Sequence, residues 1–343
     1  MAWSLSYFLG LLLGLLVSMS GEGWLSVWWA MEALGLLFLS WMCLNSSLSE
    51  RGDSSVWTYY LVQSLGGLSV LLGLSSSFLL TPDSKAESST CLGDNFPFEL
   101  VAFFGIMLKL GIPPFHGWMI RLSENLSWKQ FYVLMATQKV IPLILSCNLS
   151  SLSSLGSYWL SFSAVFCSIT SLQGVAESSI RRFLSYSSIM NLGWVLLSLT
   201  GSSWSNSLKF FLVYLLVMFL VCQTLTQAQV SSSSQSIGSR FYRKSPSSVL
   251  TSVLIITLMG IPPFPVFLVK IEILRDSLAS GLETCAASLI ISTVLLILGY
   301  IRLVAFEVMG SPSSGSEMIF SSNFWILSIL LSFFLPIMWI WIL

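Results

Sequence analysis

Long apolar stretches follow one another along almost the whole chain, and they constrain its fold more than any other feature. A membrane-spanning helix needs about 20 mostly apolar residues. We predict eleven such spans, at residues 3–20, 23–44, 56–80, 97–120, 130–147, 152–172, 180–200, 207–229, 248–274, 285–306 and 322–342. The connections between them are short and polar, and the longest lie at 81–96 and 231–248. The sequence therefore predicts an all-α polytopic membrane protein.

Composition supports this class and excludes others. Of the 343 residues, 55% are hydrophobic and only 9% are charged, whereas a soluble domain carries roughly 25% charged residues. The formal net charge is zero, so we expect no nucleic-acid partner. The six cysteines contain no CxxC pair, which argues against a zinc site, an iron–sulfur cluster or a disulfide framework. No GxGxxG or GxxxxGK[ST] motif indicates a nucleotide site.

Basic residues in the connections predict the orientation of the chain. Loops on the cytoplasm-like side of a membrane carry an excess of lysine and arginine. One set of connections holds nine basic residues: Arg51, Arg121, Lys129, Arg181, Arg182, Arg240, Arg243, Lys244 and Arg302. The opposite set holds three, namely Lys85, Lys209 and Arg275. We therefore expect the N-terminus on the basic side and, after an odd number of spans, the C-terminus on the other.

A five-residue string occurs twice. Gly-Ile-Pro-Pro-Phe stands at 111–115, in the fourth predicted span, and again at 260–264, in the ninth. The ninth span comes five after the fourth, an odd number, so the copies point in opposite directions, as in inverted-repeat transporters with broken helices. We predict one membrane domain over 1–343, with inverted five-helix halves near 1–150 and 151–306 and a C-terminal helix at 322–342. The alternative is that each proline pair only kinks its helix.

Four ionisable residues stand out because each lies inside a long apolar stretch: Glu32, Lys109, Lys139 and Lys270. Such a group costs about 2.5–3.5 kcal/mol at the bilayer centre, and its usual role is in a proton or ion path. Burial disfavours the charged form of lysine and a nearby carboxylate favours it, so a lysine between the two can change protonation state. The alternatives are lysines that extend to the interface, which suits Lys270 best, and a protonated, hydrogen-bonded Glu32.

Three further polar residues need an interpretation. His116, the single histidine, directly follows the first proline pair and is a candidate proton switch, or else a hydrogen-bonded filler. A metal site is not expected there, because no second histidine or cysteine has ligand spacing. Glu272 lies near the end of its span, where pairing with Lys270 or Arg275 would explain it. Glu99 lies near the start of its span and is interpreted as interfacial.

These segments together resemble one family. Leu108–Trp118 (LKLGIPPFHGW) resembles a signature of NADH dehydrogenase subunit 2, a core membrane subunit of mitochondrial respiratory complex I. The same family is matched by TQKVIP at 137–142, by IRRFLSYSSI at 180–189 with Gly193-Trp194, and by LMGIPPF at 258–264 with Lys270. Asn191 stands where the family often has histidine, which puts a second relay histidine in doubt. Gly117 and Ile120 also depart from the pattern.

The resemblance implies an antiporter-like fold in its shortened, eleven-span form. It also implies roles: Glu32 as carboxylate partner, Lys109 as its lysine, Lys139 as central relay, Lys270 as exit-side lysine and His116 as an intervening polar group. The chain would translocate protons within an NADH:ubiquinone reductase, while NAD, FMN, iron–sulfur clusters and ubiquinone bind other subunits. Its partners would be neighbouring antiporter-like subunits and membrane lipids. Its place would be the mitochondrial inner membrane, with the N-terminus on the matrix side.

Other functions remain open at this point. The same residues would suit a stand-alone cation/proton antiporter, which needs no redox partner. They would also suit an assembly scaffold whose channel no longer conducts. Co-purification with a large NADH-oxidising assembly separates the first alternative from the complex I interpretation. Retention of pumping after Lys139 is neutralised would favour the scaffold.

Overall fold

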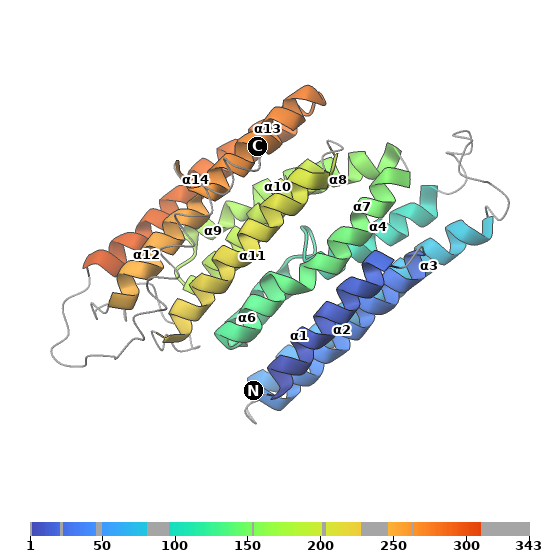
Figure 1. The fold of residues 1–343 in the computed structure, drawn as a ribbon, viewed down its shortest axis with the longest axis horizontal. Coiled ribbons are helices and arrows are strands. Elements are labelled where there is room, and N and C mark those ends of the chain that lie inside the picture. Colours follow the sequence, from blue (N-terminus) through green and yellow to red (C-terminus); the bar gives the residue numbers. More distant parts are fainter. Residues whose placement is uncertain are drawn as a thin grey trace. The chain divides into compact units, whose positions relative to one another are not determined.

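The computed structural model describes residues 2–20, 23–45, 50–80, 96–152, 154–200, 204–227, 246–262 and 264–309. Every extended regular element within these ranges is a helix (Figure 1), which confirms the predicted all-α class. Most of the two long connections, at 81–95 and 231–245, lies outside the described residues. So do Pro263 and the predicted last helix at 322–342.

The chain forms two compact units. The first comprises Met1–Asn125 and Gln138–Trp159, and the second comprises Leu126–Thr137 and Leu160–Leu343. The predicted inverted halves, near 1–150 and 151–306, stay a prediction.

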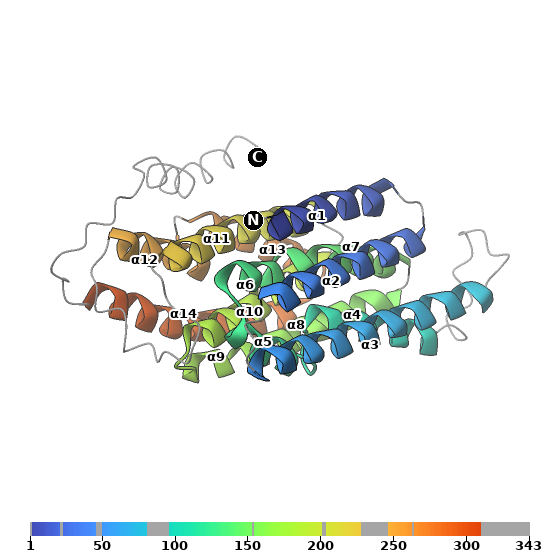
Figure 2. The ribbon, with the colours of Figure 1, turned by 90° about the horizontal axis from the view of Figure 1, so that it is seen from below.

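The first unit contains long helices that pack side by side (Figures 1 and 2). These are α1 (Ala2–Ser20), α2 (Trp24–Asn45), α3 (Glu50–Leu80), α4 (Phe96–Leu110), α5 (Gly117–Asn125) and α7 (Val140–Leu152). The most extensive contact is between α3 and α4, and α2 packs against both α3 and α7. This arrangement brings residues near 32, 63, 109 and 138 into one region.

The second unit is built around α10 (Ile180–Thr200), nearly all of which is buried. Its other helices are α6 (Trp128–Met135), α9 (Gln173–Ala176), α11 (Trp204–Gln227), α12 (Pro246–Met259), α13 (Pro265–Ala279) and α14 (Glu283–Met309). Helix α8 (Ser154–Ser171) begins in the first unit and continues into the second. Serine hydroxyls along α10 donate to carbonyls of the preceding turn, which makes a serine-rich helix compatible with burial.

The first Gly-Ile-Pro-Pro-Phe segment interrupts its span, as predicted. Helix α4 ends at Leu110, and α5 begins only at Gly117. Gly111 has a φ of 66°, a left-handed conformation that residues with a Cβ rarely adopt. Its N–H donates to the carbonyl of Leu108 (3.3 Å), and the N–H of Ile112 donates to Met107 (3.0 Å). These bonds form a Schellman motif, which satisfies carbonyls that the break would otherwise leave unpaired.

The second copy interrupts its span in the same way. Helix α12 ends at Met259, and Gly260 follows with a φ of 73°. The next helix, α13, begins with Pro265, whose missing N–H is no loss in a first turn. The predicted pair of broken helices is therefore confirmed, and their opposite orientation across the membrane stays a prediction.

The fifth span was predicted as one continuous helix at 130–147, and this prediction is wrong because the structure contains a break there. Ser127 and Gln130 form a capping box at the start of α6, which ends at Met135. A 3₁₀ turn, η1 (Thr137–Lys139), then precedes α7. Pro142 has no N–H to donate to the carbonyl four residues earlier, so the helix around Gln138 is weakened and tightens locally. Lys139 thus lies on a turn rather than in a regular helix.

Six helical segments of the described residues are long and apolar enough to cross a membrane. They are Trp24–Leu44, Trp128–Leu149, Gly156–Ala176, Ile180–Thr200, Trp204–Gln227 and Glu283–Ala305. The two spans that contain Gly-Ile-Pro-Pro-Phe fall short of this length, because none of their pieces exceeds 15 residues. The chain is therefore a multi-pass membrane protein, and the number eleven stays a prediction.

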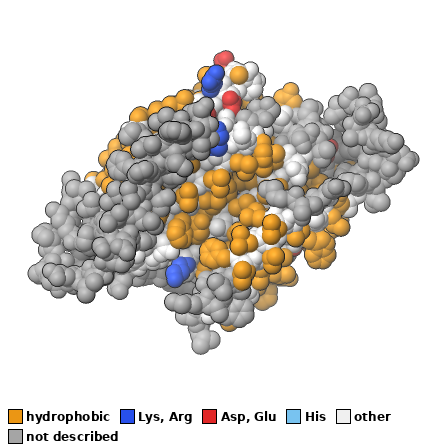
Figure 3. Space-filling view, viewed as in Figure 1, with side chains coloured by type: hydrophobic (Ala, Val, Ile, Leu, Met, Phe, Trp, Pro, Cys, Tyr) orange, Lys and Arg blue, Asp and Glu red, His pale blue; other side chains and the backbone are white. Residues whose placement is uncertain are grey.

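The described surface is largely apolar. On the face shown in Figure 3, hydrophobic side chains gather over the described part and charged ones are few. Leucines such as Leu16, Leu36 and Leu298 are at least 60% exposed. In water such a surface would be costly, but hydrocarbon or neighbouring apolar chains can cover it.

Candidate functional site: a buried lysine–glutamate pair beside a broken helix

Small residues let α3 and α4 approach each other closely. A Cβ added at Gly73 would lie 2.6 Å from the backbone of both Phe98 and Ala102, and one at Gly105 would lie 2.7 Å from the carbonyl of Gly66. Close helix contact through small residues is typical of membrane proteins, because packing there cannot rely on a difference in polarity between solvent and protein. The contact fixes the position of Lys109, one turn after Gly105.

Lys109 forms an ion pair with Glu32 in the first unit. Its ammonium nitrogen donates to Oε1 of Glu32 at 2.6 Å, and the exposed fractions of the two side chains are 2% and 24%. Lys109 is in the last turn of α4, where the negative end of the helix dipole also favours a cation. Two residues that are 77 positions apart in sequence are therefore each other's charge partner.

A glycine makes room for the carboxylate. A Cβ at Gly67, on α3, would overlap the carboxylate of Glu32, and a Cβ at Gly66 would lie 2.8 Å from Cγ of Lys109. One turn before Glu32, the indole N–H of Trp28 donates to the carbonyl of Gly67 at 3.0 Å. The glycine pair thus contacts both members of the ion pair, and Trp28 fixes α2 against α3.

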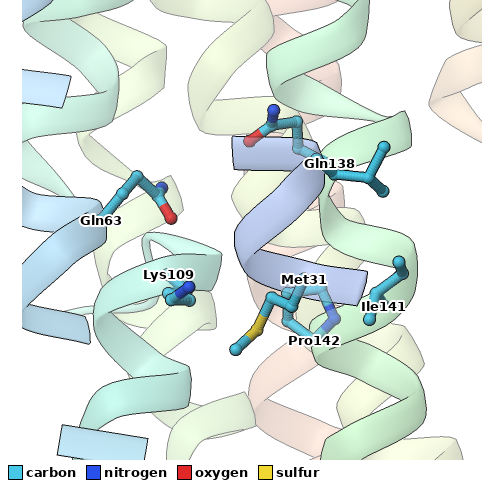
Figure 4. Close-up of a pocket in the computed structure, with 7 residues that line it drawn as sticks. Met31, Gln63, Lys109, Gln138, Ile141 and Pro142 are labelled. Carbon is cyan, nitrogen blue, oxygen red and sulfur yellow. The ribbon is translucent and has the colours of Figure 1, made fainter. Parts of the chain in front are cut away.

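A small cavity adjoins Lys109 on the side of α7 (Figure 4). Its lining residues come from five helical elements: Met31, Leu34, Gln63, Lys109, Gln138, Ile141 and Pro142. Beside it, the hydroxyl of Tyr59 donates to Oε1 of Gln138 at 2.7 Å. Sequence reasoning missed Tyr59, Gln63 and Gln138. The two amides could have been found by the criterion applied to the lysines, namely a polar side chain inside an apolar span.

The other predicted site residues in the first unit are Lys139 and His116. Lys139 is buried on the 3₁₀ turn, directly after Gln138. His116 is half-buried in the turn between α4 and α5, and its carbonyl accepts the N–H of Met119 at 3.1 Å, which starts α5. The structure thus brings Glu32 and Lys109 into direct contact and places His116 and Lys139 in the same unit.

Lys270 lies in the second unit, also beside a break. Its side chain is buried, and its ammonium lies 5.6 Å from the ring centre of Trp194. A Cβ at Gly260 would lie 3.1 Å from the same nitrogen. Lys109 is in the last turn of α4, just before Gly111, whereas Lys270 lies within α13 and its ammonium reaches back to Gly260, where α12 ends.

One expected ion pair is wrong. Glu272 pairs with Lys209 of α11 at 3.7 Å, rather than with Lys270 or Arg275. The reason is the packing of α11 against α13, which the sequence does not specify. Within the described residues, no cluster of three or more His, Cys, Asp and Glu side chains could hold a metal ion.

Broken spans, a multi-pass helical architecture and an ion pair between a buried lysine and a half-buried glutamate together define the class of antiporter-like membrane proteins. Residues 21–296 match the family model described as NADH:quinone oxidoreductase/Mrp antiporter, TM. The chain belongs to this family.

The chain is also similar in sequence to individual relatives and in fold to solved structures. The chain is 29% identical over 276 residues to NADH-ubiquinone oxidoreductase chain 2 of Artemia franciscana, which covers 79% of each chain. Its fold is similar to a chain of the membrane-bound sulfane sulfur reductase, an archaeal respiratory membrane complex (TM-score 0.81, 18% identity, 96% of this chain and 72% of that one). It is also similar to a chain of respiratory complex I from Thermus thermophilus with bound aureothin (TM-score 0.79, 18% identity, 95% and 74%).

Proposed function

We propose that the chain is an antiporter-like, proton-translocating core membrane subunit of NADH:ubiquinone oxidoreductase, respiratory complex I, of the subunit 2 type. As part of that enzyme it couples NADH-to-ubiquinone electron transfer to proton movement across the mitochondrial inner membrane. The family membership and the similarity to a subunit 2 relative over most of the chain support this assignment. The chain itself carries out no redox chemistry.

The observation that carries the proposal is the ion pair between Lys109 Nζ and Glu32 Oε1, which are 2.6 Å apart beside the break that follows α4. Removing a buried ion pair in favour of apolar residues is often neutral or stabilising, so its presence is weak evidence for a structural role. A paired lysine can change protonation state when the field on its carboxylate partner changes. Redox events elsewhere in the complex would supply that change.

The relay would begin at Glu32 and Lys109 and continue through Lys139 to Lys270, with His116 as an intervening polar group. Support for Lys139 comes from its burial on a turn. Support for Lys270 comes from its burial beside the second break. In each case the helix is interrupted beside the lysine. Irregular backbone at membrane depth is tolerated only where protein or a water-filled cavity covers it, so these positions suit a polar path.

The rest of the assignment concerns the chain's surroundings. NAD, FMN, iron–sulfur clusters and ubiquinone would bind other subunits of the complex. Neighbouring antiporter-like subunits and membrane lipids would cover the exposed apolar faces, and no nucleic acid would bind. The positive-inside bias of the sequence supports an N-terminus on the matrix side.

Two measurements test the proposal together. On a native gel the chain should migrate with an assembly that shows in-gel NADH dehydrogenase activity. In that assembly Lys109→Met should sharply reduce proton pumping, while the matched control Lys129→Met, at an exposed position on α6, should not. Migration apart from any NADH-oxidising assembly, or full pumping by Lys109→Met, would contradict the assignment.

A second candidate is a stand-alone cation/proton antiporter, because the family description itself includes Mrp antiporters. Purified alone in liposomes, the chain should fail to exchange sodium or potassium for protons under an imposed gradient. Robust exchange by the single chain would favour this candidate over the complex I subunit.

A further inference from the structure

The cavity beside Lys109 has a polar wall that the relay of charged residues does not explain. Gln63 of α3 and Gln138 of η1 both line it, together with Lys109. In Figure 4, Gln63 and Lys109 lie on one side of the view, and Gln138, Ile141 and Pro142 lie on the other. The remaining lining comes from apolar residues, so the amides and the lysine are the polar groups that an occupant would meet.

The amide of Gln138 has an unused donor. Its Oε1 accepts the hydroxyl of Tyr59 at 2.7 Å, which fixes the orientation of the amide. Its Nε2 is buried and has no hydrogen-bond partner among the described residues. A buried donor without an acceptor is energetically costly, so a hydrogen-bond partner for this N–H is favoured.

Tyr59 is itself held firmly. Its side chain is almost fully buried, and its ring packs edge-on against Phe38 at 5.2 Å and lies 6.3 Å from the ring of Trp118. A residue in this setting cannot turn away from Gln138 without disturbing the core between α2 and α3. The Tyr59–Gln138 bond therefore has a fixed geometry.

One face of α3 connects this bond to the ion pair. Tyr59, Gln63 and Gly66 follow one another at i, i+4 and i+7, so they lie on the same side of the helix. They contact, in turn, Gln138, the cavity and Lys109. Seven residues of helix span about 10 Å, so the polar groups form a short continuous row.

We propose that this cavity binds one water molecule, and that Gln138 is the residue that positions it against Lys109. The space is sufficient for about a single water, which needs two to four polar partners. Gln138 Nε2 donates to the water oxygen, Lys109 donates to it as well, and the water donates to the amide oxygen of Gln63. The water is thus a second polar partner for Lys109 besides Glu32, and Tyr59 fixes the amide that holds it.

This inference rests on the proposed function, because it gives the water a role at the lysine of the relay. A lysine whose only partner is Glu32 loses all of its compensation when that carboxylate is protonated or moves. With the water present, the ammonium keeps a hydrogen-bond acceptor. The free-energy cost of a change in charge at Glu32 is then lower than it would be without the water, so the complex turns over faster.

The test uses the assembled respiratory complex. A density map of the wild-type complex should contain a water peak within hydrogen-bond distance of Lys109 and Gln138. Gln138→Leu should remove the peak and lower proton pumping and turnover about fivefold to tenfold, as expected for the loss of one useful hydrogen bond. The KM for ubiquinone should not change, because the quinone site is on other chains.

Tyr59→Phe supplies an independent variant, which releases the amide but keeps the ring. It should lower pumping in the same direction, whereas Tyr60→Phe, at the exposed neighbouring position, should not. Gln223→Leu, in α11 of the second unit, controls for loss of an amide from a membrane helix. If Gln138→Leu does not assemble, the wild-type map and Tyr59→Phe decide the question.

The outcomes separate the two proposals. An empty cavity in the wild-type map, or full pumping by both Gln138→Leu and Tyr59→Phe, would overturn the water site even if Lys109→Met stops pumping. Full pumping by Lys109→Met would overturn the proposed relay instead. A water peak together with slow variants at unchanged KM would support the positioning role.

Discussion

The ammonium group of Lys270 lies 5.6 Å from the ring centre of Trp194, which is almost fully buried in the second unit. A cation over an indole face is attracted by the ring quadrupole, more strongly where water is excluded. The same nitrogen lies against Gly260, where α12 ends. Trp194 and the glycine together define where the lysine can rest, and this gives the first prediction.

Gly260→Ala should displace Lys270 and lower pumping. The left-handed conformation alone costs about 1–2 kcal/mol with a Cβ, and the new methyl would also press on the lysine. Gly281→Ala is the matched control, since Gly281 has a φ of 76° and nothing within 4 Å of an added Cβ. Both variants should lower the thermal stability of the subunit, and only Gly260→Ala should slow proton pumping. Equal pumping by the two would show that the contact with Lys270 is not functional.

Gly67→Ala should separate the ion pair without removing either charge. The added methyl would overlap the carboxylate of Glu32, so that group must move away from Lys109. We expect about 1–3 kcal/mol of destabilisation from overpacking and a pumping defect like that of Glu32→Gln. Gly117→Ala, where an added Cβ has nothing within 4 Å, controls for the substitution itself. The measurements are thermal unfolding and the proton-pumping rate. A Gly67→Ala complex that pumps normally would show that pumping does not depend on the Glu32–Lys109 contact.

Glu32→Gln and Lys109→Met should each impair activity, and their effects should not simply add. Removing one member of a buried pair strands the other charge, at about 3–5 kcal/mol when both are fully buried. The 24% exposure of Glu32 places the cost toward the lower end. A double-mutant cycle on pumping rate measures the coupling, and we expect the double variant to be less impaired than the sum of the two losses. Strict additivity would show that the contact has no energetic consequence for transport.

Lys139→Met should leave the complex assembled and lower pumping about a hundredfold, the scale of a positioned proton-transfer group. Burying an amine is unfavourable, so an apolar side chain of similar length at this position should still allow the subunit to fold. The assay compares proton uptake per electron in complexes matched for amount on a native gel, with Lys129→Met as control. Undiminished pumping would remove Lys139 from the relay and favour the scaffold interpretation.

The sequence by itself determined the all-helical class and the two breaks at the repeated segment, but not the break before Pro142. Apolar length predicted where helices run, because a bilayer requires each backbone group to be satisfied within its own span. The repeated Gly-Ile-Pro-Pro-Phe predicted both interruptions, because proline removes a backbone donor and glycine permits the left-handed turn that follows. The cost of a buried charge singled out Glu32, Lys109, Lys139 and Lys270. Each of these properties depends on a single residue or on a short stretch of sequence, so it can be predicted from residue type and position.

Only the tertiary structure decided which side chains meet. That Glu32 contacts Lys109 depends on the glycines that let α2, α3 and α4 approach one another. The Tyr59–Gln138 bond joins residues 79 positions apart. Glu272 faces Lys209 because of how α11 packs against α13. Contacts between helices depend on packing angle and rotation, which many sequences of the same apolar pattern could satisfy differently, and so the partners became known only from the fold.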